Sequence, residues 1–222
     1  MSFRTNTPTN ASVVVPSSDG RLSAPSAEKN AGPITDLVKE FASEKGEALE
    51  IASGTGQHIV KLAIAKPNLN WQPSDIDQLR ISSIETWCND YDFANVKLPV
   101  ILDATEIGWS AKFNSQTFIL LVNLMHLISK DEAKILITEI ALALAPEGRS
   151  IIYGPFKRNG KLTSAGDQTF HQSLIKADQQ IGYKNDDWMT AQFKDAKLKL
   201  LKVAMMPANN LAFIYEKPRI QD

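Results

Sequence analysis

The stretch LEIASGTGQH, residues 49–58, constrains the fold more than any other part of this chain. A short apolar run carries a carboxylate at Glu50, glycines follow at positions 54 and 56, and a helical pattern begins after them. Glycines after a strand let a ligand approach the backbone and allow dihedral angles that a Cβ opposes. In open α/β sheets, ligands bind beyond the carboxyl ends of strands. The stretch therefore predicts either a tight strand-to-helix turn or a ligand-binding loop.

Strand-like and helix-like patterns alternate from Ile34 onward. Short apolar runs predict five strands, over residues 47–53, 68–75, 95–105, 116–128 and 149–156. Apolar residues at helical spacing predict helices over residues 34–44, 55–67, 76–90 and 129–148, and one or two more within 157–194. Two final runs, 197–207 and 210–218, are joined through PANN and predict an antiparallel hairpin. The pattern predicts an α/β fold with a mostly parallel seven-stranded sheet and helices on both faces.

The composition is that of an ordinary globular protein, with 43% hydrophobic and 22% charged residues among 222. The net charge of −1 gives no electrostatic footprint for nucleic acid or an anionic membrane. No apolar run reaches the roughly 18 residues that a membrane span needs. The single cysteine, Cys88, excludes an internal disulfide framework and fits a reducing compartment, so a cytoplasmic location is expected.

Residues 1–26 are rich in Ser, Thr and Pro and are expected to form a disordered tail, with one folded domain over 27–222. Two arginines and one acid precede Glu28, so mitochondrial import through this tail is the alternative. Three prolines interrupt the helical period that an import signal needs.

Three cofactor families use a glycine loop at this position. The phosphate-binding P-loop ends in Gly-Lys-Ser/Thr, whereas this chain has Gln57 and His58 there. The dinucleotide fingerprint needs a third small residue where this chain has Ile59. S-adenosylmethionine has no phosphate, and its ammonium group and ribose hydroxyls need acceptors such as carboxylates. Glu50 before the glycines therefore favours S-adenosylmethionine over a nicotinamide dinucleotide.

Acidic residues close three successive predicted strands. Glu50 can hold the amino-acid end of the cofactor directly or through water, Asp75 can accept both ribose hydroxyls, and Asp103 can accept the adenine amino group. The loop NLMH after the fourth strand, which begins at Asn123, would line the side of methyl transfer. Each acid alone is typical of a solvated loop, but their order along the strand ends favours a binding site.

Several uncommon segments together resemble the methyltransferase-like protein 26 family: EKNAGPI, LEIASGTGQH, WQPSD, LMHLIS, IIYGPFKRNG and MPANN, within residues 27–218. The resemblance implies a Rossmann-like class I methyltransferase fold and an S-adenosylmethionine-dependent methyltransferase, without naming the acceptor. It implies that Asn30 can close over the cofactor, and that Ala52 replaces the usual first glycine of the loop. The implied cofactor contacts are Glu50, Ala52, Ser53, Gly54, Gly56, Asp75 and Asp103.

The chain departs from that family's pattern on the acceptor side. Similar proteins have a Phe-Asp pair where GDQTFHQ places His171. They have Trp-Gly-x-Arg-Asp where IGYKNDD places Ile181, Lys184 and Asn185. These departures leave two function classes open: a working methyltransferase, and a cofactor-binding protein that has lost transfer and acts through protein partners.

Two residues are candidates for catalysis. His126, at the end of the fourth predicted strand, has an ordinary pKa near neutrality and can serve as general base, or it can be hydrogen-bonded to the structure. Tyr153, after the fifth, can orient an acceptor or pack in the core. The three histidines lack metal-ligand spacing, so no metal is expected. The Gly-x-Ser-x-Gly elbow of serine hydrolases is absent, which excludes that class of enzyme. The Asn/Asp-Pro-Pro-aromatic motif is absent too, and with the near-zero net charge this disfavours DNA and leaves RNA, protein and small molecules as acceptors.

Overall fold

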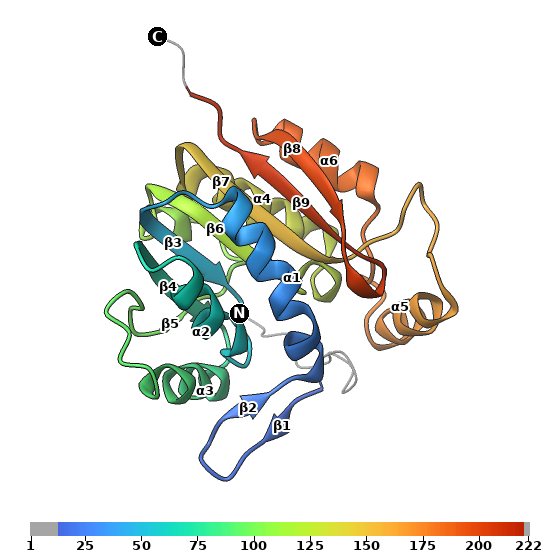
Figure 1. Cartoon of the computed structure of the whole chain (residues 1–222). Helices are drawn as coiled ribbons and strands as arrows, with labels where there is room; N and C mark the ends of the chain where they lie inside the picture. The colour runs from blue at the N-terminus through green and yellow to red at the C-terminus, as the bar shows by residue number, and fades with distance from the viewer. Residues whose placement is uncertain (1–12, 220–222) are drawn as a thin grey trace.

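A seven-stranded sheet forms the centre of the computed structural model, which describes residues 13–219. Its strands run in the order β5-β4-β3-β6-β7-β9-β8 (Figure 1). Their bounds are β3 Gly46–Ile51, β4 Leu69–Asp75, β5 Val100–Ile101, β6 Gln116–Val122, β7 Leu144–Pro155, β8 Lys199–Met205 and β9 Asn210–Glu216.

The first five strands in this order are parallel, and β9 pairs antiparallel with both β7 and β8. The strand order reverses between β3 and β6, which are neighbours although β4 and β5 separate them in the chain. Such a reversal opens a crevice beyond the carboxyl ends of the two strands, where open α/β sheets bind ligands. The predicted fold class and the C-terminal hairpin are confirmed.

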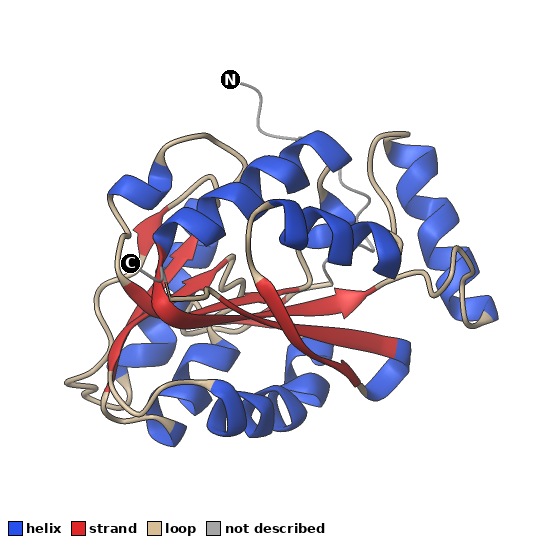
Figure 2. Ribbon diagram, turned by 90° about the horizontal axis from the view of Figure 1, so that it is seen from above, coloured by secondary structure: helices blue, strands red, loops and turns tan. Residues whose placement is uncertain are grey.

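Helices cover both faces of the sheet (Figure 2). Helices α1 Pro25–Phe41, α2 Gln57–Ala65 and α3 Gln78–Asn89 pack on one face, and α4 Lys130–Ala143 and α6 Asp186–Asp195 pack on the other. The remaining helix, α5 Ala165–Ala177, lies beyond the sheet near the carboxyl ends of its parallel strands (Figure 1). The predicted helices within 157–194 are therefore α5 and α6.

Strand β6 shows why the centre of the sheet is apolar on both sides. Phe118 and Leu120 belong to the core under α1, α2 and α3, whereas Ile119 and Leu121 belong to the core under α4 and α6. All four side chains are fully buried. A strand covered on both faces needs a continuous apolar run, as FILL provides.

The N-terminal region differs from the predicted disordered tail of residues 1–26. Residues 1–12 lie outside the described part, but a small hairpin of β1 Val15–Pro16 and β2 Leu22–Ser23 follows them. Helix α1 then begins at Pro25, well before the predicted start at Ile34. Proline suits the first helical position because its missing N–H would have no helical partner there. The apolar spacing that predicted this helix extends only over its second half.

Two other boundaries differ from prediction. The third predicted strand, residues 95–105, is reduced to the two residues of β5. The fourth helix ends at Ala143 instead of near residue 148, and β7 begins at Leu144. A Cβ at Gly148 would lie 2.6 Å from the Gln116 carbonyl oxygen, so this part of β7 passes too close to β6 for a side chain. Gly148, the last residue of the predicted helix, instead allows β7 to lie close to β6.

The N-terminal hairpin is attached to α3 through Ser83, which is fully buried. Its Oγ accepts from the Leu22 N–H at 2.8 Å and donates to the Thr55 carbonyl at 2.8 Å. The indole N–H of Trp87 also donates to the Leu22 carbonyl at 2.9 Å. Ser83 therefore joins the hairpin, α3 and the glycine loop.

We expect Ser83→Ala to lower the free energy of unfolding by about 1–3 kcal/mol, because it leaves two buried backbone groups without a partner. The neighbouring Ser82→Ala is the control, since the Ser82 hydroxyl is exposed and bonds only within its helix to Gln78. Urea denaturation of both variants measures the difference. Equal stability of the two variants would contradict this attachment.

Candidate functional site

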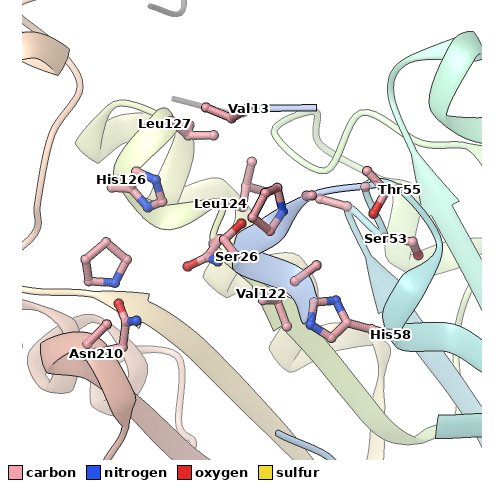
Figure 3. A pocket seen from close by; sticks show the side chains of 18 of the residues that line it. Val13, Ser26, Ser53, Thr55, His58, Val122, Leu124, His126, Leu127 and Asn210 are labelled. Atoms are coloured by element: carbon pink, nitrogen blue, oxygen red, sulfur yellow. The ribbon is translucent and has the colours of Figure 1, made fainter. Parts of the chain in front are cut away.

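A cavity of about 530 Å³ opens where the strand order reverses, at the carboxyl ends of β3 and β6 (Figure 3). Five segments form its wall: residues 24–27 at the start of α1, the glycine loop 52–55, residues 122–127 after β6, the aromatic residues Phe170 and Tyr183, and Asn210 at the start of β9. Val13, His58, Arg80, Pro155 and Ala208 complete it.

The glycine loop has an unusual backbone. Ala52, Gly54 and Gly56 all have positive φ angles, of 54°, 62° and 92°. A left-handed angle at a non-glycine residue stores strain, which tends to occur at functional sites. Ala52, which stands where the resemblance has a glycine, thus adopts a left-handed conformation that favours glycine.

The two glycines serve different purposes. Gly54 lines the cavity, and a Cβ there would meet no atom closer than 3.7 Å. Gly56 does not line the cavity; a Cβ there would lie 2.9 Å from the Ile84 Cα and 3.2 Å from Trp87. Gly56 therefore allows α2 to pack closely on α3, a role that its spacing from Gly54 did not indicate.

Two buried carboxylates lie behind this loop. Asp75, at the end of β4, accepts from the Gly54 N–H at 2.9 Å and lies 4.0 Å from the Arg80 guanidinium. Glu50 in β3 is fully enclosed, and its Oε2 has no partner among residues 13–219. Burial raises the pKa of Glu50 to about 8, with a smaller raising effect from the nearby Asp75, although the Ser53 hydroxyl lowers it. Burial likewise raises the pKa of Asp75, against the lowering effect of Arg80.

Four polar side chains form a connected set beside the cavity, and two of them, His58 and Asn210, line it. The Asn30 side-chain oxygen lies 2.7 Å from the His58 Nε2, and Asn30 also interacts with the Tyr153 hydroxyl. The Asn210 amide donates to the same hydroxyl at 2.9 Å. Burial, followed by the charge of Lys61, lowers the pKa of His58 to about 4. His58 is thus a neutral link between α1 and the glycine-loop helix.

The segment that follows β6 forms the wall of the cavity opposite the glycine loop (Figure 3). Asn123 has a φ of 58°, and its N–H donates to the Tyr153 carbonyl at 2.9 Å. His126 follows in the 3-10 helix η2 (Met125–Leu127) and is buried beside the cavity. Burial, and then the charge of Lys184, lower the pKa of His126 to about 3. This differs from the near-neutral value expected from the sequence, because the imidazole is removed from water.

The structure brings some predicted site residues into the cavity wall and leaves others behind it. Those in the wall are Ala52, Ser53, Gly54, Asn123 and His126. Those outside it are Asn30, Glu50, Gly56, Asp75, Asp103 and Tyr153. Asp103 accepts from the Thr105 N–H and hydroxyl and so shapes its own turn. Tyr153 lies within β7 rather than after it, and packs in the core under α1.

Several wall residues were not predicted, chiefly Thr55, Arg80, Phe170, Tyr183 and Asn210. Phe170 belongs to α5 and Tyr183 to the loop after it, within the weakly patterned region 157–194. The segment MPANN did contain Asn210, but nothing in its spacing gave the residue a role. Thr55 lies between the two glycines of the loop, and this position in the sequence could have indicated that it lines the cavity.

The positions that depart from the resemblance have structural partners. His171 Nδ1 accepts from the Tyr183 N–H at 3.1 Å. The buried Lys184 ammonium donates to the carbonyls of Ile128 and Gly182. Asn185 accepts from the Gly160 N–H at 2.6 Å. Lys184 thus joins the loop after α5 to the segment that carries His126, whereas these bonds of His171 and Asn185 lie within residues 160–185.

Among residues 13–219, no group of three or more His, Cys, Asp or Glu side chains is placed to hold a metal ion. Within the same range, every helix is too short or too polar to cross a membrane.

A family model described as "Protein of unknown function (DUF938)" matches residues 21–217. An O-methyltransferase family protein from Burkholderia thailandensis is similar in structure, with a TM-score of 0.73 at 16% identity, over 86% of this chain and 57% of that one. An O-methyltransferase family 2 protein from Planctomyces limnophilus, in complex with apigenin, gives 0.72 at 15% identity, over 86% and 57%. PigF, solved with SAH (S-adenosylhomocysteine), gives 0.69 at 14% identity, over 84% and 55%.

These likenesses concern the fold, which is the class I methyltransferase fold. The chain spans 55–57% of the length of the three proteins it matches.

The contrast between the two glycines can be measured. Alanine at either position incurs about 1–2 kcal/mol of left-handed strain, but only Gly56→Ala adds overlap with α3, for a further 1–3 kcal/mol or so. We expect urea denaturation of the ligand-free protein to show Gly56→Ala as the less stable variant. The reverse order of stability would contradict the assignment of Gly56 to helix packing.

Proposed function

This chain belongs to the DUF938 family of proteins of unknown function, and we propose that it is an S-adenosylmethionine-dependent methyltransferase. The observation that carries the proposal is the glycine loop with its two buried carboxylates. Ala52 and Gly54 present backbone to the cavity at the reversal of strand order, and Glu50 and Asp75 lie directly behind. Carboxylates at this place favour a ligand with an ammonium group and hydroxyls over one with a pyrophosphate.

The residues present fit S-adenosylmethionine. Glu50 Oε2, buried without a partner among the described residues, is an acceptor in need of a donor. Ser53 lines the cavity, and its hydroxyl donates to the Glu50 main-chain carbonyl at 3.2 Å, so it joins the residue that carries the carboxylate to the cavity wall. An ammonium group bound near Ser53 would favour the charged form of Glu50.

Asp75 has acceptor capacity beyond its present bonds. It accepts from the N–H groups of Gly54 and Asp77, and two carboxylate oxygens together provide about four acceptor sites. We propose that it holds the ribose hydroxyls, and that Asp103 lies toward the adenine. Gly54 leaves room for the cofactor to lie against the loop.

When bound, S-adenosylmethionine supplies an electrophilic methyl group. The contribution of the chain is to align an acceptor with that group and to exclude water. We place the transfer beside Asn123 and His126, across the cavity from the glycine loop. A neutral His126 can take a proton from the acceptor.

The finer assignment to the methyltransferase-like protein 26 family is part of the same proposal and rests on the segments that resemble it. A cytoplasmic location remains a prediction. Two of the structural neighbours are named O-methyltransferases, which supports an oxygen atom as the acceptor of the methyl group.

We expect S-adenosylhomocysteine to bind and to raise the melting temperature, because a ligand selective for the folded state stabilises it. Asp75→Asn should weaken binding by roughly 10- to 150-fold, the range for a lost hydrogen bond to a charged group. The amide oxygen of the new side chain can still accept from the Gly54 N–H, so the loop should keep its shape. Calorimetry measures the affinity for S-adenosylhomocysteine of the wild-type protein and of Asp75→Asn.

Asp77→Asn is the matched control. Asp77 caps α3 by accepting from the Leu79 N–H at 2.8 Å, and asparagine caps helices equally well. Its affinity for S-adenosylhomocysteine should match that of wild type. NAD binding as tightly as S-adenosylhomocysteine would overturn the cofactor, and unchanged affinity in Asp75→Asn would remove Asp75 from the ribose role.

A further inference from the structure

Three rings form the cavity wall that faces away from the glycine loop: His126, Phe170 and Tyr183, called here the aromatic wall. Their ring centroids lie 5.6 Å apart for His126–Phe170 and 6.1 Å apart for each of the other two pairs. Each pair meets edge to face, at interplanar angles of 63° to 70°. This is the arrangement that ring quadrupoles favour, so the three rings hold one another in place.

The aromatic wall lies across the cavity from the predicted cofactor side. Figure 3 shows His126 and Leu127 on one side and Ser53, Thr55 and His58 on the other. Phe170 is only partly buried although it touches the cavity. An aromatic ring that is exposed to a cavity, and is not packed in the core, provides a surface on which a ligand can bind.

Charge is missing from this wall. Among the described residues that line the cavity, Arg80 alone carries a formal charge, and it lies on the glycine-loop side beside Asp75. His126 is neutral at physiological pH because burial keeps its pKa low. Asp167, which lies 3.3 Å from the Tyr183 hydroxyl, and Lys184, whose charge acts on His126, do not line the cavity. An ammonium group or an acidic group placed here would lose its hydration without a counter-charge in the wall itself. The wall therefore suits an uncharged molecule.

Asn210 adds one directed polar group. Its Nδ2 donates to the Tyr153 hydroxyl at 2.9 Å and to the Pro207 carbonyl at 3.1 Å. A carbonyl can only accept, so the amide nitrogen must face Pro207, and both of its hydrogens are then in use. The Oδ1 of Asn210 is consequently left to accept a hydrogen bond from a ligand in the cavity that Asn210 lines.

We propose that the methyl acceptor is an uncharged, flat aromatic molecule with a hydroxyl group, stacked on the aromatic wall, its hydroxyl donating to Asn210. An oxygen lone pair of that hydroxyl attacks the methyl carbon as the carbon–sulfur bond breaks, and the bonding pair stays on sulfur, giving S-adenosylhomocysteine. As the oxygen–methyl bond forms, the hydroxyl hydrogen turns from Asn210 to the neutral imidazole of His126, which accepts the proton. A methylated oxygen that still carries its proton is a far stronger acid than imidazolium, so even a weak base accepts it. This inference rests on the proposed function and specifies its acceptor.

The test supplies tritiated S-adenosylmethionine and the full-chain protein to an extract of cells that lack it. Protein and RNA are then precipitated, and the remaining small molecules are extracted into an organic solvent at pH 2 and at pH 10. We expect alkali-stable label that extracts at both pH values, as a neutral aryl methyl ether does. Label in protein or RNA, label that extracts only at pH 10 as an amine does, or label released by alkali as from an ester would each overturn the acceptor class.

The outcomes separate this inference from the proposed function. Label in a different fraction leaves the methyltransferase standing and removes the aromatic acceptor. S-adenosylhomocysteine that binds without transfer of label to any fraction overturns both and favours a cofactor-binding protein that acts through partners. Absence of S-adenosylhomocysteine binding overturns the cofactor itself.

A pair of variants on α5 tests the aromatic wall directly. Phe170→Leu keeps apolar volume but removes one ring, and we expect the KM of the labelled acceptor to rise about three- to tenfold while the affinity for S-adenosylhomocysteine is unchanged. Gln172→Ala, at an exposed position of the same helix, is the control and should change neither value. An unchanged KM in Phe170→Leu would contradict stacking on this wall, and parallel loss of both affinities would indicate a structural effect.

Discussion

Four hydrogen bonds fasten the glycine loop to the end of β4, and the candidate site depends on them. The Ser53 N–H donates to the Ser74 carbonyl at 2.8 Å, and the Ser74 N–H donates to the Ser53 hydroxyl at 3.1 Å. The Ser74 hydroxyl donates to the Glu50 carbonyl at 2.8 Å, and the Gly54 N–H donates to Asp75 at 2.9 Å. These bonds continue the pairing of β3 with β4 beyond its last ladder pair, so they hold a strained loop in one conformation.

One of these bonds uses the side chain of a buried acid, Asp75, and the side chain of Glu50 is a second buried acid behind the loop. Glu50 and Asp75 each have a raised pKa because burial disfavours their charged forms. Asp75 is partly compensated by two backbone N–H groups and Arg80, whereas Glu50 keeps an oxygen without a partner among the described residues. A cationic ligand would interact favourably with that oxygen, and we infer that these two acids favour binding of a sulfonium cofactor.

The sequence allowed prediction of the features that depend on local periodicity. The continuous apolar run of β6, the acids at the ends of β3 and β4, and the closing hairpin all follow from short patterns. Features that depend on tertiary contacts could not be predicted from the sequence. The first half of α1 buries only small or polar side chains, so its apolar signal is weak, and Gly56 needs its small size because of Ile84, which belongs to a different helix. Phe170 and Tyr183 reach the cavity through contacts such as the Gly182 N–H to the His126 carbonyl, which join segments far apart in the chain.

We infer that the cavity at the reversal of strand order holds S-adenosylmethionine against the glycine loop. A crystal structure of the protein with S-adenosylhomocysteine would show whether it does. We expect the homocysteine end beside Ser53 and Gly54, the ribose hydroxyls on Asp75, and the sulfur directed toward His126. A ligand bound elsewhere, or one in this cavity with its ribose hydroxyls away from Asp75, would contradict this assignment.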